Sequence, residues 1–385
     1  MSDLDMIDRL NTCLRFDTAG RVEVLDHQAA DEALAGMSSR PKAREIERCL
    51  VKRDFSDNRL LALSGPQARS GTVIALVSTP YLRDAADQRI ISLQGFQYTD
   101  LDAPGSLRSE YPAPDVRPVN LYASTKGILD TIRYVAFFPD SVVGDCPEGY
   151  ADGIYFCAKF VTAFEERVRP LLDRLWLPRS FVALRSATHA QLLTAAANWV
   201  HLHEHHHCEA LLPISKYARL KNTRLSGAFE ELRVDICAML SDLDEAMDRD
   251  MAQITFEFIL AFRLIYYGSS FAPERDYDAI TSVALSNMLG EGGCIGRGSD
   301  GRYRLAADAD LREVLAHGLE RMNAIETALA ADDLMADGTQ LPALRATLET
   351  QVQRLCRCED QKTIRRGPFH ARHAEAIETL VPEPA

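Results

Sequence analysis

The spacing of apolar residues along the chain changes near residue 150. Before that point, short apolar runs alternate with turn residues at 21–25, 59–64, 72–78, 88–97 and 131–138, a pattern typical of β-strands. A helix is expected at 42–51, and the proline-rich stretch 102–118 is predicted to be an extended loop or linker. The N-terminal half is therefore expected to be mixed, with a small sheet.

Beyond residue 151, apolar positions recur at spacings of three and four, as on one face of a helix. Helices are predicted at 154–176, 189–209, 225–243, 251–267, 278–289, 310–330, 342–357 and 370–380. The segment 294–305 differs, because its Gly298–Gly301 turn is typical of a β-hairpin. We predict an α+β fold with an N-terminal region (1–150), a helical metal-binding core (151–270), and a helical C-terminal region with a hairpin (271–385).

The overall composition narrows the classes of protein and partner. With 46% hydrophobic and 26% charged residues, the chain has the composition of a globular protein. A net charge of −13 disfavours nucleic acid as a partner, because phosphate backbones would be repelled. We expect a cytoplasmic protein with no membrane partner, since there is neither a signal-like N-terminus nor an apolar run of about 18 residues. Nine cysteines without a CxxC pair predict thiols instead of a disulfide framework.

The most distinctive chemistry lies in the segment 201–207, which holds five of the ten histidines. His203 and His207 stand four residues apart, so a helix would place both on one face with Glu204 beside them. That arrangement suits a zinc ion and an activated water. His201 and His205 are also four apart, but Leu202 follows His201 where a glutamate would be needed. We expect His201 and His205 on the outer face of the helix, as surface or accessory residues.

A second predicted helix, 225–243, offers further ligands. Glu231 follows His207 by 24 residues, and Asp235 lies one helical turn beyond it. Two neutral imidazoles and one carboxylate would leave a fourth zinc position open for a water whose pKa falls towards ~7. A carboxylate next to that water, such as Glu204, can then carry its proton.

These two motifs resemble the signature of gluzincin metallopeptidases, the thermolysin-like zinc enzymes, over residues 189–243. The run from Glu230 to Asp235 is also similar to the second motif of dipeptidyl-peptidase III, although the first motif of that family has one more residue between its histidines. The resemblance implies His203, His207 and Glu231 as zinc ligands and Glu204 as the general base. It implies that Asp235 accepts a hydrogen bond from a ligand imidazole. The implied activity is zinc-dependent hydrolysis of an amide or peptide-like bond in a peptide or small molecule.

Two other interpretations of the same residues stay open. The two histidines and Glu231 equally suit a ferrous ion, Fe²⁺, in a two-histidine, one-carboxylate site. Alternatively, a non-catalytic structural zinc could complete its shell with Cys208 or His206. Glu204 separates a hydrolase from both, because only a hydrolase needs a base there.

Other candidate groups are expected to have ordinary roles. The cationic residues between the two helices are predicted to form a solvated loop: Lys216, Arg219, Lys221 and Arg224. Four groups could serve as proton donor or oxyanion stabiliser, although core packing or plain surface is the expectation for each: Tyr266, Tyr267, His317 and His370.

Overall fold

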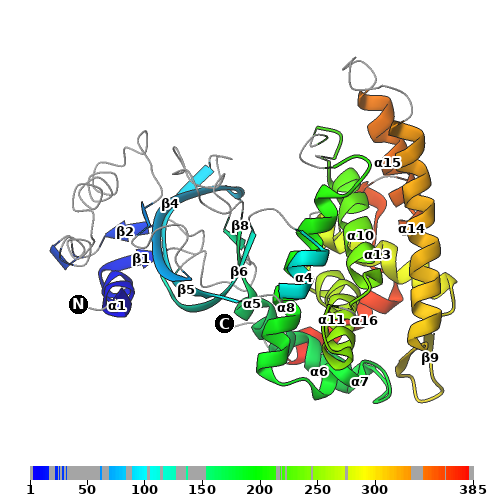
Figure 1. Ribbon diagram of the computed structural model, residues 1–385, viewed down its shortest axis with the longest axis horizontal. Coiled ribbons are helices and arrows are strands. Elements are labelled where there is room, and N and C mark those ends of the chain that lie inside the picture. Colours follow the sequence, from blue (N-terminus) through cyan, green and yellow to red (C-terminus); the bar gives the residue numbers. More distant parts are fainter. Residues whose placement is uncertain are drawn as a thin grey trace. The chain divides into compact units, whose positions relative to one another are not determined.

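A computed structural model describes most of the helical half and a smaller part of the N-terminal half. The described residues are 3–16, 22–24, 26, 28–29, 32, 61–62, 69–83, 89–101, 105–112, 116–126, 136–137, 153–213, 217, 219–221, 223–243, 246–273, 276–330, 341–359 and 361–380. The chain divides into two compact units (Figure 1), unit 1 comprising Met1–Asp102 and Pro114–Phe160, and unit 2 comprising Ala103–Ala113 and Val161–Ala385. The predicted α+β class is confirmed, while the boundaries at residues 150 and 270 stay predictions.

Unit 1 is organised around a mixed six-stranded sheet of order β3-β4-β5-β6-β8-β7. The strands are β3 (Leu61–Ala62), β4 (Ser70–Arg83), β5 (Arg89–Asp100), β6 (Val116–Ser124), β7 (Ala136–Phe137) and β8 (Gly153–Phe156). Neighbours pair antiparallel except β6 and β8, which are parallel. Helix α1 (Asp3–Cys13) and the hairpin of β1 (Leu14–Phe16) and β2 (Val22–Val24) precede the sheet.

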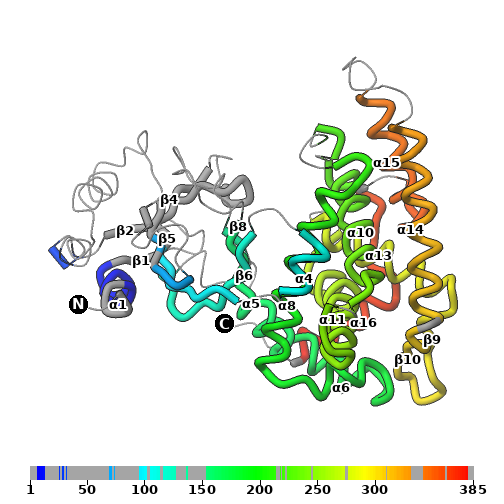
Figure 2. Tube along the Cα trace, viewed as in Figure 1, coloured from blue at the N-terminus to red at the C-terminus, as the bar shows by residue number. Residues whose placement is uncertain are grey.

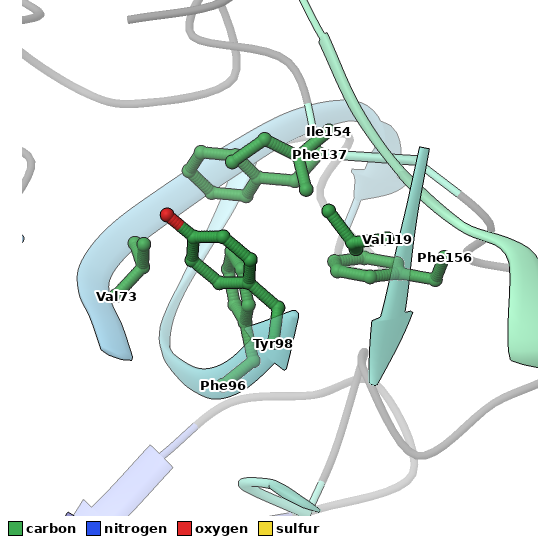
Figure 3. Packing of buried hydrophobic residues seen from close by; sticks show 7 residues of the cluster. All are labelled: Val73, Phe96, Tyr98, Val119, Phe137, Ile154 and Phe156. Atoms are coloured by element: carbon green, nitrogen blue, oxygen red, sulfur yellow. The ribbon is translucent and has the colours of Figure 1, made fainter. Parts of the chain in front are cut away.

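One side of this sheet carries an aromatic core (Figure 3). Phe96 lies at its centre, 5.4 Å from Phe137 and 5.1 Å from Phe156 between ring centroids. These residues come from β5, β7 and β8, and because side chains two apart in a strand share a face, Tyr98 of β5 and Ile154 of β8 join the same cluster. The core depends on strands that are far apart in the sequence.

Unit 2 is mainly helical. The boundary between the units falls within α5 (Cys157–Ala163). The elements that follow are the π-helical turn η3 (Phe164–Val168), α6 (Arg169–Leu175), α7 (Val182–Ser186), α8 (His189–Cys208), α10 (Arg224–Leu240), α11 (Arg249–Ala261), the π-helical turn η4 (Phe262–Tyr267), α12 (Gly268–Ser270), α13 (Tyr277–Glu291), α14 (Asp308–Ala330), α15 (Leu341–Cys356), η5 (Gln361–Thr363) and α16 (Pro368–Leu380). The predicted hairpin is confirmed as β9 (Ile295–Arg297) paired with β10 (Tyr303–Leu305). None of the helices in the described part of the chain is long and apolar enough to cross a membrane.

Three helices position the histidine segment. Helix α8 packs against α10 and α11 (Figure 2 follows the chain through all three). Thr188 caps α8 through a reciprocal pair with Gln191, in which Gln191 N donates to Thr188 Oγ1 and Thr188 N donates to Gln191 Oε1. Thr223 and Ser226 form the same kind of box at the start of α10. These caps fix where each helix begins, and therefore which residues face each other.

Two predicted elements are wrong. The segment 154–176 is not one helix, because Ile154 and Phe156 belong to β8 and bury their side chains in the sheet core. The stretch 102–118 is not an extended loop throughout, because it contains α4 (Gly105–Glu110) and the start of β6. Of its prolines that the structure describes, Pro112 follows α4 and Pro118 lies within β6, paired with Tyr155 of β8. The helix predicted at 42–51 lies outside the described residues.

Candidate metal centre

His203 and His207 project from the same face of α8 towards α10. Their Nε2 atoms lie 3.0 Å apart, and their ring planes are nearly perpendicular at 85°. Two nitrogen ligands at ~2.0 Å from a tetrahedral zinc ion would lie about 3.3 Å apart. The helix therefore brings together the pair that its four-residue spacing predicts.

The other nitrogen of each ring meets a buried carboxylate. His203 Nδ1 lies 3.0 Å from Asp235 Oδ1, and His207 Nδ1 lies 2.9 Å from Glu230 Oε1. A carboxylate only accepts, so each Nδ1 donates its proton and each Nε2 is left as the acceptor nitrogen of a neutral ring. Two such lone pairs facing each other repel unless a proton or a cation lies between them. The arrangement thus favours a positive charge at the meeting point of the two Nε2 atoms.

Glu231 and Glu204 add two more carboxylates near the histidine pair. Glu231 Oε2 lies 3.4 Å from His203 Nε2, and Glu231 Oε1 lies 3.7 Å from His207 Nε2. Glu204 has a carboxylate oxygen within 4.8 Å of a nitrogen of each histidine. Burial would lower the pKa of His203, but Glu231 and Asp235 outweigh it and raise that pKa to about 9. The carboxylates therefore favour one positive charge at Nε2 of His203, which either a second proton or a bound metal ion can supply.

Arg263 balances the carboxylates on one side of the pair. Its guanidinium contacts Asp235 and Asp278, and its Nη2 lies 3.3 Å from Glu231 Oε2. Burial alone would raise the pKa of Asp235, yet Arg263 and His203 lower it, so the carboxylate is ionised. Trp199 Nε1 donates to the same Asp235 oxygen at 2.8 Å. Asp235 is therefore fixed in position to receive the His203 proton.

A second charged cluster lies behind His207. Glu230 Oε2 accepts from Lys221 Nζ at 2.5 Å, and Glu230 Oε1 accepts from Arg233 Nη2 at 2.9 Å. Lys221 also donates to Glu326 of α14 at 2.9 Å. The prediction of a solvated cationic loop is wrong for Lys221, whose side chain has no exposed surface. Lys216 lies outside the described residues.

Sequence reasoning missed Glu230, Arg263 and Glu326. The available signal was weak: Glu230 stands next to Glu231 in a helix whose neighbouring positions are apolar. A glutamate on the buried side of a helix needs a partner. The burial of Glu230 therefore predicts a partner, but not where in the chain that partner lies.

His201 and His205 are buried, so the prediction that they lie on the outer face of α8 is wrong. His201 and His205 are each 7% exposed. His201 Nε2 donates to the carbonyl of Tyr111, and His205 Nδ1 donates to the carbonyl of Pro112, both at 2.7 Å. Tyr111 and Pro112, which follow α4, thus contact that face of α8. His206 Nε2 lies 3.0 Å from Ser241 Oγ, so it has a hydrogen-bond partner on the α10 side.

The candidates for a proton donor are mostly structural. His370 is buried and donates to the carbonyl of Leu264 at 3.0 Å, and burial lowers its pKa to about 3. Tyr266 packs in the aromatic core of unit 2, while Tyr267 lies under the guanidinium of Arg263 at 4.8 Å. His317 is exposed on α14 beside Glu320. Core packing and surface, as expected, account for these four.

The donor set fits a divalent metal ion. Two neutral imidazoles present Nε2 to one point, a carboxylate lies within 4 Å of both, and each imidazole is oriented by a carboxylate on its other nitrogen. Nitrogen and oxygen donors in this number suit zinc with an open position, and they also suit ferrous iron. Of the two cysteines on α8 and α10, Cys208, the candidate ligand for a structural zinc, is exposed, and Cys237 is only partly buried.

Comparison with known proteins gives a likeness in fold. No protein-family model and no curated protein sequence matches the chain. The structure of DPP III from Caldithrix abyssi aligns with a TM-score of 0.55 at 12% identity, over 96% of this chain and 72% of that one. The structure of dipeptidyl-peptidase III from Corallococcus sp. strain EGB aligns with a TM-score of 0.45 at 12% identity, over 96% and 74%. The first likeness concerns the fold: the chain is folded like the Caldithrix protein over nearly its whole length.

Proposed function

We propose that this protein is a zinc-dependent hydrolase of an amide or peptide-like bond. The observation that carries the proposal is the pair of Nε2 lone pairs of His203 and His207, 3.0 Å apart, with Glu231 within 4 Å of both. His203, His207 and Glu231 would hold the ion. The fold shared with the Caldithrix DPP III supports a peptide-like substrate.

When bound, a zinc ion supplies Lewis acidity, which makes water more acidic and a carbonyl more electrophilic. Glu204 accepts the proton of the attacking water at a carboxylate oxygen as the oxygen–carbon bond forms. It returns that proton to the leaving nitrogen as the carbon–nitrogen bond breaks, so that proton and charge balance. Asp235 and Glu230 keep the Nδ1 protons of His203 and His207 in place, which holds both rings as neutral ligands.

The test is Glu204→Gln, which keeps the size of the side chain and removes the base. The variant is expected to retain about one equivalent of zinc by elemental analysis and to lose ~10²–10⁴-fold in turnover. Activity is read by mass spectrometry on a mixture of short peptides. Glu209→Gln is the matched control, because Glu209 is an exposed glutamate just beyond the same helix. Full activity in Glu204→Gln would sink the hydrolase mechanism.

The ligand assignment is tested separately. His203→Ala and Glu231→Ala are each expected to purify without the metal while remaining folded by circular dichroism. Iron in place of zinc in the wild-type protein would support the ferrous alternative. Wild-type protein that is folded, metal-free and unable to take up zinc or iron contradicts the site as a whole.

A further inference from the structure

Behind His207 lies a closed group of four charged side chains: Lys221, Glu230, Arg233 and Glu326. They have side-chain exposures of 0%, 1%, 4% and 1%. Two are cations and two are carboxylates, so the group is neutral as a whole. Such a group is stable in a protein interior only while every charge is matched, since one unpaired buried charge costs several kcal/mol.

Both oxygens of Glu230 are shared. Oε1 accepts from His207 Nδ1 at 2.9 Å and from Arg233 Nη2 at 2.9 Å. Oε2 accepts from Lys221 Nζ at 2.5 Å and from Arg233 Nε at 3.2 Å. The two cations therefore compete with the imidazole for the negative charge of one carboxylate.

Glu326 relieves that competition from α14. It lies 2.9 Å from Lys221 Nζ and 3.6 Å from Arg233 Nε, so it shares both cations with Glu230. Without Glu326, Glu230 would be the one carboxylate left to balance both cations among the described residues, although Arg233 Nη2 also donates to the His206 carbonyl at 2.8 Å. The group would then carry one uncompensated positive charge. The stronger pull of the cations on Glu230 makes His207 a poorer ligand, because Glu230 is then less available to His207 Nδ1. The uncompensated positive charge repels a divalent cation from the neighbouring site.

We propose that Glu326 is a positioning residue for the metal centre: by holding Lys221 and Arg233 it leaves Glu230 charged and directed at His207 Nδ1, and so sets the affinity for the metal ion. The proposal rests on the metal site of the proposed function, though not on the hydrolytic activity. It assigns α14, more than 100 residues from the HExxH motif in the sequence, a role in metal binding.

The experiment measures zinc affinity by competition with a chromophoric chelator, on purified full-length protein shown to be folded by circular dichroism. Glu326→Gln removes one negative charge and keeps the side-chain volume. It is expected to weaken zinc binding about tenfold, the lower end of the range for groups that orient metal ligands. Glu257→Gln is the matched control, because Glu257 is another buried glutamate of unit 2 that bonds to Leu184 N, away from this group. The control is expected to bind zinc like the wild type.

The sign of a second substitution separates positioning from structural damage. Lys221→Gln removes a competitor for Glu230, so the double variant Lys221→Gln/Glu326→Gln is again neutral. Its zinc affinity is expected to return to within about threefold of the wild type. Structural damage would instead make the double variant bind more weakly than Glu326→Gln alone. If Glu326→Gln does not fold, the double variant is compared with Lys221→Gln instead. Lys221→Gln leaves the group with one net negative charge, whereas the double variant is neutral, so the double variant must bind zinc about tenfold more weakly than Lys221→Gln.

The outcomes also separate this inference from the proposed function. Normal zinc affinity in folded Glu326→Gln, or a further loss in the double variant, overturns the inference and leaves the hydrolase proposal untouched. A wild-type protein that binds zinc but cleaves no peptide-like bond sinks the hydrolase proposal and leaves the positioning role. A wild-type protein without zinc affinity overturns both.

Discussion

Asp235 is the residue on which the orientation of His203 depends. It accepts from His203 Nδ1 and Trp199 Nε1 through one oxygen and contacts Arg263 through the other. Asp235→Asn keeps the shape but loses the charge that holds the imidazole and balances Arg263. We expect a ~10–100-fold loss of zinc affinity, measured by chelator competition.

Trp199→Phe is the control for that substitution. It removes the indole donor but keeps an aromatic ring on α8, so the carboxylate and its bond to His203 remain. Zinc affinity should fall much less than in Asp235→Asn. Equal losses in the two variants would mean that packing around Asp235 matters more than its charge.

Gly268 is required where the chain passes His370. A Cβ at this position would lie 2.2 Å from His370 Cδ2, so the imidazole would have to move away from its bond to the Leu264 carbonyl. Gly268→Ala is expected to lower the free energy of unfolding by about 1–3 kcal/mol, as overpacking does. Urea unfolding followed by circular dichroism measures it.

Gly290 provides the opposite case on α13. A Cβ there would have nothing within 4 Å, so Gly290→Ala should leave stability unchanged or raise it by up to ~1 kcal/mol through helix propensity. If both alanine variants behaved alike, a steric explanation for Gly268 would be wrong.

At the residue scale, the sequence was informative where chemistry has a fixed spacing. His203, Glu204 and His207 are linked by a single helical turn, and Glu231 and Asp235 by another, so their faces could be predicted. Arg263 reaches Glu231 and Asp235, and Glu326 reaches Lys221 and Arg233, only through folding. Nothing in the local pattern distinguishes a buried arginine from an exposed one, because both occur in amphipathic helices.

At the scale of elements, helix α16 docks through two neutral histidines. Burial lowers the pKa of His370 to about 3 and that of His373 to about 4. His373 Nε2 accepts from Trp176 Nε1 at 2.9 Å, a bond that a protonated ring could not accept. The unfolded chain takes up protons near pH 6.5 while the folded protein does not. The contribution of His370 and His373 to the free energy of unfolding is therefore constant above pH 6.5 and becomes destabilising as the pH falls below 6.5.

Each of these histidines should cost about 1.4 kcal/mol of stability for each pH unit below 6.5, down to its own folded pKa. The free energy of unfolding in urea, measured from pH 7 to pH 5, gives the slope. His370→Gln should lose the slope of one proton whatever its effect at pH 7. Parallel curves for variant and wild type would show that folding does not lower the pKa of His370.

A helix was predicted accurately where the sequence shows a capping residue and a regular apolar stripe. The prediction of 189–209 for α8 and the observed His189–Cys208 agree because Thr188 can begin a helix and the apolar stripe is regular. Strand β8 was missed because Ile154 and Phe156 continue, by chance of spacing, the helical stripe of α5. Its true role depends on the parallel pairing with β6, a long-range contact that periodicity does not contain.

On the scale of the whole molecule, the candidate centre belongs entirely to unit 2. His203, His207 and Glu231 lie there, and so do the carboxylates and cations that contact them among the described residues. The sheet of unit 1 has its own aromatic core around Phe96. Metal binding should therefore stabilise one unit and leave the other unchanged.

Hydrogen exchange with and without zinc tests this division. Binding adds RT ln(1 + [Zn]/Kd) to the stability of the unit that holds the ion, ~4 kcal/mol when free zinc exceeds Kd a thousandfold. Backbone amides of α8 and α10 should exchange more slowly with zinc, whereas those of β5 and β6 should exchange at the same rate. In His203→Ala, zinc should change neither set, which controls for binding elsewhere. Zinc-dependent protection of β5 equal to that of α8 would show instead that the two units unfold together, because a ligand stabilises every part of a cooperative unit alike.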